Sequence, residues 1–309
     1  MEGPRETEGR EIVVYNSCSQ RVWPTIANLP HRLQHVIAAG IRTRVFIAGP
    51  EDGAAIVLVP PLFLTLDTFL YAIPGLAQKY LVIAYDKPGR GFSDIASAPQ
   101  SVAFLADHLL SLIEKLGIDG LPLFLSGSGF GGWVAARAVS KGGVKSIRGL
   151  ILNNPGNPRP HVVDALRAAN LQEIEEGTLE AARKGLRRLV SSERYVLEDL
   201  ACIRYVTHLL SGEKPAVAKE NVEFCLAAFG NKEDSWEESW VEKIVVPTLV
   251  IWSTQNKIDH ISDYDSFISR LPKASLKIID GGMLPQIEQP ELFVSLHQDF
   301  IEEVRKDGR

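Results

Sequence analysis

The hydrophobic residues of this chain gather in short runs that alternate with longer stretches of helical periodicity. Short apolar-rich runs bounded by Gly, Pro or Asn suit strands that are buried on both faces of a sheet. Between residues 101 and 116 the apolar side chains recur on one helix face, and Gly117 ends that stretch. The strand-like runs span residues 56–59, 80–85, 123–125, 147–152, 248–252 and 275–279.

Strands that alternate with helices predict an α/β fold, in which a mostly parallel twisted sheet carries helices on both faces. Residues 35–48 predict a β-hairpin, because the second half begins with alternating apolar and polar side chains. We expect a helix over residues 67–79, with Asp67 as its N-cap and with Pro74 kinking or splitting it. A closing helix is expected to begin near Pro290.

The character of the chain changes between residues 157 and 240, where strand signals vanish. A helical segment between two strands predicts a lid inserted over the carboxyl ends of the strands, where open α/β sheets bind ligands. We therefore predict a core of residues 1–156 and 241–309 and a lid of residues 157–240. The amphipathic helical stretches of the lid lie near residues 178–190, 193–210 and 215–229.

Composition narrows the range of partners and compartments. The net charge of −5 gives no reason to expect a nucleic acid or an anionic membrane as a partner. No apolar run approaches the ~20 residues of a membrane span, and the first residues lack the apolar core of a signal peptide. Cys18, Cys202 and Cys225 have no ligand-like spacing, which is typical of idle thiols in a reducing compartment. We expect a cytoplasmic protein, with a homodimer left open.

No metal ion or cofactor is expected. The His, Cys and Asp residues show no cluster with the spacing of metal ligands. Residues 127–132 fit the letters of a dinucleotide-binding loop, but no acidic residue on a following strand supports that interpretation.

One glycine-rich stretch organises the chain. The apolar residues 123–125 enter a glycine-rich turn, and the helix-forming residues 134–139 leave it. In this strand–turn–helix context α/β-hydrolases carry their nucleophile, in the pattern G-x-S-x-G. Here the frame Gly127-Ser128-Gly129-Phe130-Gly131 has glycine at the central position, where the nucleophile would stand.

The chain resembles the lidded α/β-hydrolases beyond this turn. That family uses Ser, Asp or Glu, and His in this chain order, together with backbone donors for an oxyanion. The lid, with Arg204 and Tyr205 on a predicted helix, is similar to that of the carbon–carbon bond hydrolases that open ring-cleavage products. The matching segments follow in the order of the family at residues 40–44, 86–94, 127–132, 246–252 and 287–291.

The resemblance assigns three triad positions, and none of them holds the residue that the chemistry needs. Gly129 stands at the nucleophile and supplies neither a hydroxyl nor a thiol. Asn256 stands at the acid, and an amide cannot stabilise an imidazolium as a carboxylate does. Met283 stands at the histidine, before Leu-Pro, and a thioether takes up no proton at neutral pH. We therefore expect no hydrolysis by a triad.

The anion-binding part of the site is expected to survive. Where the family has His-Gly after its first long strand, this chain has Pro60-Pro61, followed by Leu62. The resemblance implies that the backbone N–H groups of Leu62 and Phe130 donate to an oxyanion. Trp252 is expected to complete an apolar pocket around them.

Three further residues are candidates for chemistry. Ser128 lies one residue before the nucleophile position and is expected to face away from the pocket, so a packing role is weighed against a displaced nucleophile. Asp259 and His260 follow within the loop that carries Asn256, and His is the commonest general base, although a surface His is commoner still.

Other ionisable residues are assigned structural or surface roles. His108 and His297 lie on helix patterns and are expected at the surface. Asp86 follows a predicted strand, and the resemblance implies that it fixes its loop.

Two functions follow from these residues. The first is a non-hydrolytic enzyme that binds an apolar small molecule through a carbonyl group and promotes cyclisation, isomerisation or elimination without a covalent intermediate. Natural-product biosynthesis is the natural setting for such an enzyme. The second is a non-catalytic pseudo-hydrolase that serves as a small-molecule binder, receptor or scaffold. An open pocket favours the enzyme, and a collapsed one favours the scaffold.

Overall fold

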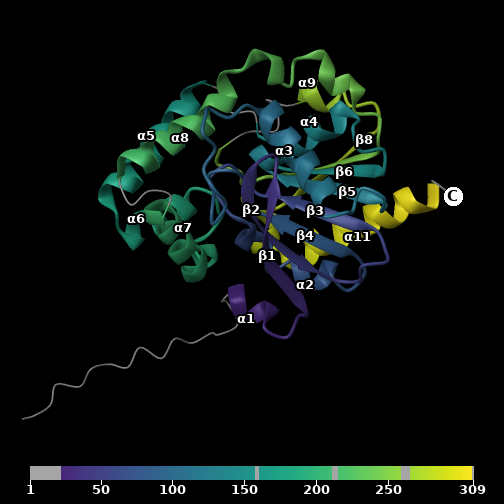
Figure 1. Cartoon of the computed structure of the whole chain (residues 1–309), viewed down its shortest axis with the longest axis horizontal. Helices are drawn as coiled ribbons and strands as arrows, with labels where there is room; N and C mark the ends of the chain where they lie inside the picture. The colour runs from purple at the N-terminus through teal and green to yellow at the C-terminus, as the bar shows by residue number, and fades with distance from the viewer. Residues whose placement is uncertain (1–21, 157–159, 211–214, 259–264, 308–309) are drawn as a thin grey trace, which may run out of the picture.

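The computed structural model describes residues 22–156, 160–210, 215–258 and 265–307. These residues form one eight-stranded sheet in the order β1-β2-β4-β3-β5-β6-β7-β8. β2 runs antiparallel to both of its neighbours and the other adjacent pairs are parallel, which confirms the predicted α/β fold (Figure 1). The strands are His31–Ala38 (β1), Ile41–Ala48 (β2), Ala55–Val59 (β3), Leu81–Tyr85 (β4), Leu123–Ser128 (β5), Ile147–Asn153 (β6), Thr248–Ser253 (β7) and Ala274–Ile279 (β8).

Helices cover both faces of this sheet. The longer ones are Val102–Lys115 (α3), Phe130–Lys141 (α4), Pro160–Glu176 (α5), Leu179–Arg187 (α6), Glu198–Leu210 (α7), Pro215–Leu226 (α8) and Pro290–Asp307 (α11). The short ones are Val22–Ile26 (α1), Ile73–Leu76 (α2), Asp265–Ile268 (α9) and Pro285–Glu288 (α10).

Each face of the sheet has its own hydrophobic core. On one face α3 and α4 pack together with strand residues such as Val57 and Leu125. On the other face α2 and α11 pack with the neighbouring strand residues Ile56 and Phe124. Because successive side chains of a strand point to opposite faces, continuous apolar runs are needed to supply both cores.

The helices α5 to α8 fall between β6 and β7 and gather at one side of the sheet (Figure 1). α6, α7 and α8 lie within the three stretches predicted from helical periodicity, and α5 is an additional helix. The buried residues of α5 are Val163, Asn170 and Glu173. Because two of these three residues are polar, α5 has no apolar stripe, and its sequence shows no amphipathic pattern. The wider division into a core and a lid stays a prediction.

The expected β-hairpin and the helix from residue 101 are both confirmed. β1 pairs with β2 from His31 opposite Ala48 to Ala38 opposite Ile41. α3 begins after Ser101, whose hydroxyl caps the helix.

The prediction of a helix over residues 67–79, kinked or split at Pro74, is wrong, because the helix is broken before Ile73 and Pro74 lies inside α2. A short 3-10 helix, η2 (Leu66–Phe69), and the single turn of α2 take its place. The carboxylate of Asp67 caps no helix, because it is fully buried and accepts hydrogen bonds from Arg44 and from the hydroxyl of Thr65. Hydrogen bonds to a charged guanidinium are stronger than those to a backbone N–H, so the ion pair determines the local structure.

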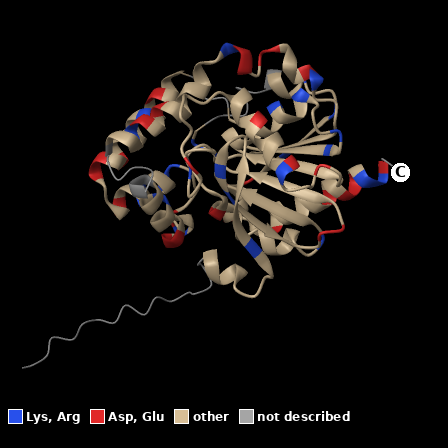
Figure 2. Cartoon of the chain, viewed as in Figure 1, with Lys and Arg blue, Asp and Glu red and all other residues tan. Residues whose placement is uncertain are grey.

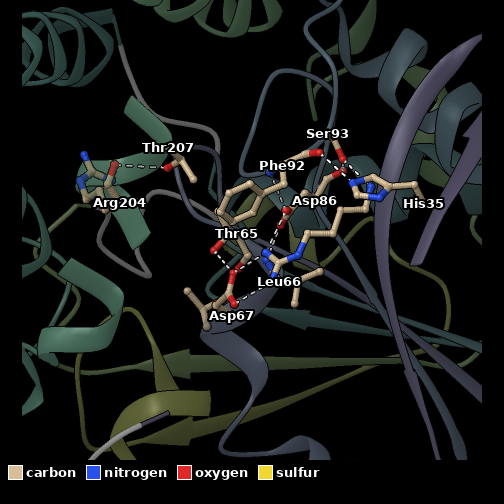
Figure 3. A network of polar contacts seen from close by, with 11 residues as sticks. His35, Thr65, Leu66, Asp67, Asp86, Phe92, Ser93, Arg204 and Thr207 are labelled. Atoms are coloured by element: carbon tan, nitrogen blue, oxygen red, sulfur yellow. Dashed lines mark hydrogen bonds and ion pairs between the residues drawn. The ribbon is translucent and has the colours of Figure 1, made fainter. Parts of the chain in front are cut away.

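A buried ionic network holds the loops that follow β3 and β4 (Figure 3). The Arg44 guanidinium donates to both carboxylate oxygens of Asp67, at 2.8 and 3.1 Å, and to Asp86 Oδ2 at 3.2 Å. Asp86 also accepts hydrogen bonds from the backbone N–H of Leu66, at 2.8 Å, and of Phe92, at 3.0 Å. Both carboxylates are fully buried, which confirms the structural role expected for Asp86.

Charged side chains of both signs lie interspersed along the outer helices in the view of Figure 2. Within the described ranges we find no helix with the length and hydropathy that crossing a bilayer requires.

His108 and His297 were expected at the surface, and both are fully buried. The Nδ1–H of His297 donates to the carbonyl oxygen of Phe293 at 2.7 Å, and its Nε2 accepts from the hydroxyl of Ser126 at 2.8 Å. The Nε2 of His108 lies 2.8 Å from the hydroxyl of Thr43. The expectation failed because helical periodicity does not report a hydroxyl partner that lies on a distant strand.

Arg44→Met leaves the buried carboxylates of Asp67 and Asp86 without their cation. The free energy of unfolding should fall by about 3–5 kcal/mol, the usual cost of removing one partner of a buried ion pair. Burial, followed by repulsion from Asp67, raises the pKa of Asp86 to about 6 against the attraction of Arg44. A carboxyl group with a raised pKa stabilises the fold at low pH and loses that contribution as the pH rises through 6. The decrease in unfolding free energy that Arg44→Met causes should therefore be smaller at pH 5 than at pH 7.5, as measured by urea unfolding.

Arg42→Met is the matched control, because Arg42 lies on the same strand and its ion pair with Asp94 is exposed to solvent. An exposed pair contributes little, so the change should stay below about 0.5 kcal/mol. Equal losses in the two variants would contradict the role given to the buried network.

His297→Gln should change how stability depends on pH. Burial lowers the pKa of His297 to about 4, whereas the unfolded chain takes up its proton near pH 6.5. The neutral imidazole therefore contributes its full stability above pH 6.5 and loses it as the pH falls toward 4. The difference in unfolding free energy between wild type and variant should shrink by roughly 1–2 kcal/mol from pH 7.5 to pH 5. A difference that stays constant would refute the assignment; His35→Gln, at an exposed position, is the control.

Candidate ligand-binding pocket

The predicted strand–turn–helix stretch is confirmed, and its turn is a single residue. β5 ends at Ser128 and α4 begins at Phe130, with Gly129 between them at φ 53° and ψ −125°. A Cβ at Gly127 would overlap with the carbonyl oxygen of Gly131, and a Cβ at Gly131 would overlap with that of Val59. Glycine at these two positions lets the first turn of α4 approach β3 and β5 closely.

The space beside Gly129 is occupied by Met283. A Cβ on Gly129 would lie 2.5 Å from Met283 Cε and 3.7 Å from Pro61 Cβ. Met283 is 8% exposed, and its backbone N–H donates to the carbonyl oxygen of Leu189 at 3.0 Å. Its own carbonyl oxygen accepts from Asn154 Nδ2 at 3.2 Å. The structure thus brings Gly129 and Met283, which the resemblance assigns to the nucleophile and to the histidine, close together, and the methyl group of Met283 occupies the space beside Gly129.

Asn256 lies in the loop after β7. Its backbone N–H donates to the carbonyl oxygen of Ser253 at 3.3 Å, and its Oδ1 accepts from the N–H of Ile258 at 3.0 Å. Ile258 lines the pocket described below, whereas Asn256 is not among the lining residues. Asp259 and His260 lie outside the described residues.

The pocket opens between the loop after β3, the start of α4 and the helices α5 to α7. It leaves about 70 Å³ in which the centre of a water molecule can lie. Most of its wall is apolar, as expected for a small-molecule site. The wall includes Pro61, Leu62, Phe63, Leu64, Phe130, Leu166, Asn170, Arg188, Leu189, Arg204, Phe229, Ile258 and Met283.

Besides Asn256, three residues named from the sequence do not line this pocket. Trp252 is 2% exposed and packs in the hydrophobic core on the α3 and α4 face of the sheet, because a central strand buries its whole length. Ser128 is fully buried, and its hydroxyl accepts from Gln286 Nε2 at 3.4 Å. Pro60 contributes its carbonyl oxygen to a bond with Lys87 instead.

Within the described residues, two backbone N–H groups of the pocket wall have no protein acceptor. Leu62 and Phe130 both line the pocket, and in the described structure neither N–H donates to a protein acceptor. The first N–H groups of a helix have no partner inside the helix, which explains the free donor of Phe130. The sequence assigned these two N–H groups to an oxyanion, and that role stays a prediction.

The buried amino group of Lys87 fixes the direction of the Leu62 donor. Its Nζ donates to the carbonyl oxygens of Pro60 and Pro61, at 2.8 and 2.6 Å. Because C=O and N–H of a trans peptide point in opposite directions, the N–H of Leu62 points away from Lys87. Burial, followed by repulsion from Arg90, lowers the pKa of Lys87 to about 7. The sequence did not indicate a role for Lys87, because its only distinguishing feature there is a charged side chain next to Asp86.

The wall opposite these donors rests on a buried ion pair. Arg204 pairs with both carboxylate oxygens of Glu173 at 2.7 Å and also donates to Asn170 Oδ1 at 3.0 Å and to the carbonyl oxygen of Phe63 at 3.2 Å. A Cβ at Gly185 would lie 2.7 Å from Arg204 Nε, so glycine is needed where α6 passes the pair. The pair joins α5 and α7 to the loop after β3.

The ionisable side chains of the described wall are Arg188 and Arg204. A guanidinium stays protonated in proteins and donates hydrogen bonds only, so neither residue can act as a general base. The described wall can therefore bind and orient a ligand by donors and shape.

Comparisons with known proteins identify the fold. The chain matches the alpha/beta hydrolase fold family over residues 54–290. It is 25% identical over 283 residues to 3-oxoadipate enol-lactonase 1 of Acinetobacter baylyi, with 89% of this chain and 98% of that protein covered.

Solved structures with the same fold include enzymes of several kinds. The enol-lactonase from Burkholderia xenovorans LB400 superposes with a TM-score of 0.72 at 22% identity, covering 87% of this chain and 99% of that one. The meta-cleavage product hydrolase CumD from Pseudomonas fluorescens IP01 does so with a TM-score of 0.70 at 21% identity, covering 87% and 97%. At this identity the likeness concerns the fold. With its family match over most of its length, this chain belongs to the alpha/beta hydrolase fold family.

Proposed function

We propose that this chain is a non-hydrolytic member of its family, which binds an apolar small molecule through a carbonyl group. It promotes cyclisation, isomerisation or elimination without a covalent intermediate, with natural-product biosynthesis as the natural setting. The observation that carries the proposal is the methyl group of Met283, which lies 2.5 Å from where the Cβ of a residue at position 129 would stand.

In this proposal the family's nucleophile, acid and base correspond to Gly129, Asn256 and Met283. A covalent mechanism needs a nucleophile beside a proton acceptor, and these side chains offer neither. The methyl group of Met283 also excludes a water molecule from the place where a hydroxyl oxygen would attack. Hydrolysis through a covalent intermediate therefore lacks its nucleophile.

The catalytic contribution comes from the N–H groups of Leu62 and Phe130. A carbonyl oxygen that accepts from both gains stabilisation as negative charge develops on it, for example during enolisation or ring closure. One such donor contributes about 3–4 kcal/mol in an oxyanion hole. Lys87 supports this role, because it holds the Leu62 peptide in one orientation before a ligand arrives.

Proton movement in the proposed reaction is assigned to the loop after β7. Ile258 lines the pocket, and Asp259 and His260 are the next two residues in the chain. A histidine that follows a pocket residue so closely is the natural candidate for a general base.

A second function is favoured by one specific observation. The described wall of the pocket holds two arginines and no other ionisable side chain, which suits binding without chemistry. In this alternative the chain is a small-molecule binder, receptor or scaffold, and the free N–H groups serve recognition alone.

The proposal predicts that the wild type hydrolyses ester, thioester, lactone and epoxide substrates no faster than a buffer blank. Hydrolysis at ordinary enzymatic rates would contradict both functions. Incubation with a library of lipophilic carbonyl compounds, followed by mass spectrometry, then distinguishes the two proposed functions. The enzyme returns an isomer or an elimination product, at a rate that His260→Ala lowers if His260 moves the proton. The binder returns its ligand unchanged.

Gly129→Ala tests whether Met283 fills the site of the nucleophile. The variant should lose roughly 1–3 kcal/mol of unfolding free energy, because an alanine is strained at φ 53° and its Cβ meets Met283 Cε. In a Met283→Ala background the loss should be smaller by about 0.5–1 kcal/mol, as measured by a double-mutant cycle in urea.

Gly142→Ala is the matched control for this cycle. Gly142 also has a positive φ, of 67°, but a Cβ there meets nothing within 4 Å. Its loss should therefore be the same in the wild-type and in the Met283→Ala background. A zero coupling energy between positions 129 and 283 would remove the observation on which the proposed function rests.

A further inference from the structure

Two guanidinium groups line the apolar pocket, and they differ in what they bind. Arg204 is 5% exposed, and Glu173, Asn170 and Phe63 accept its hydrogen bonds. The bidentate carboxylate of Glu173 balances its charge. Arg204 therefore holds the wall together and has no free charge for a ligand.

Arg188 has no such partner. It follows the last residue of α6, remains accessible to solvent and lines the pocket beside Leu189. Within the described part of the chain its guanidinium makes no hydrogen bond and no ion pair. Burial, followed by repulsion from Arg204, lowers the pKa of Arg188, and Glu173 opposes that change. Since an arginine stays charged at neutral pH, this part of the pocket carries an unbalanced positive charge.

The backbone that carries Arg188 is fixed relative to the rest of the pocket. The carbonyl oxygen of Leu189 accepts from the N–H of Met283 at 3.0 Å, and that of Val190 accepts from Lys257 Nζ at 2.7 Å. These bonds tie the end of α6 to the loops after β7 and β8. The backbone that carries the cation is thus fixed before a ligand binds, which reduces the entropy lost on binding.

We propose that Arg188 binds a carboxylate of the ligand, so that the ligand class is a small apolar monocarboxylate. The apolar body lies against the wall that Phe130 and Met283 help to form, while a carbonyl oxygen reaches the free N–H groups. A carboxylate matches the two parallel donors of a guanidinium. A phosphate ester would bring up to two negative charges, and the described wall offers one unbalanced cation. This inference rests on the proposed function, because it concerns the same pocket.

Matched acids and amides test the inference by isothermal titration calorimetry on the full chain. The probes are butanoate, hexanoate and phenylacetate, each paired with its primary amide, which has nearly the same shape and no charge. The wild type should bind at least one carboxylate at least tenfold more tightly than the corresponding amide.

Arg188→Gln should weaken that carboxylate at least tenfold and leave the amide unchanged. Arg148→Gln is the control for net charge, because Arg148 is exposed near the beginning of β6, away from the carboxyl ends of the strands. It should leave both affinities at the wild-type value.

The outcomes separate this inference from the function on which it rests. If acids and amides bind the wild type equally, or if Arg188→Gln leaves carboxylate affinity unchanged, the inference is overturned and the pocket remains a ligand site. If no member of either series binds, the proposed function is overturned, and the inference falls with it.

Discussion

Three buried cations hold one loop, residues 60–67, and the pocket depends on that loop. Lys87 binds two of its carbonyl oxygens, Arg204 binds a third, and Arg44 binds the carboxylate near its end. A buried donor that loses an acceptor costs stability, so each of these hydrogen bonds favours the observed conformation of the loop. The cations come from the loop after β4, from α7 and from β2, and the loop is therefore the place where the sheet and the inserted helices are joined.

The same constraint determines the direction of one backbone donor of the pocket wall. With the carbonyl oxygens turned toward Lys87, the N–H of Leu62 points in the opposite direction. The N–H of Phe130 is free for a different reason, since it begins a helix that Gly127 and Gly131 allow to lie close against the sheet. Two unrelated features, a buried ammonium group and a close helix–strand contact, thus supply one pair of donors in an apolar pocket.

In the proposed function Gly129 stands where the fold usually supports covalent chemistry, and the methyl group of Met283 fills the space beside it. What remains at the pocket is hydrogen-bond donation by backbone groups and positive charge on Arg188. Both interactions recognise oxygen atoms. The backbone donors suit the oxygen of a carbonyl group, and the positive charge suits the oxygens of an anion. The proposed ligand combines these features, and the absence of a general base on the described wall explains why binding without chemistry stays the alternative.

The sequence alone determined the sheet, the hairpin, the helices α3 and α11 and the glycine turn, because burial on strands and helices leaves a local period and close approach requires glycine. It also named Leu62, Phe130 and Met283, since each lies in a short recognisable motif. Only the tertiary structure decided that Met283 fills the space beside Gly129, that Lys87 orients the Leu62 peptide and that Arg204 pairs with Glu173. These contacts join residues far apart in the chain, and no local pattern records which loops converge. For the same reason His297, which sits on an amphipathic helix, was expected at the surface, and its Ser126 partner on β5 explains its burial.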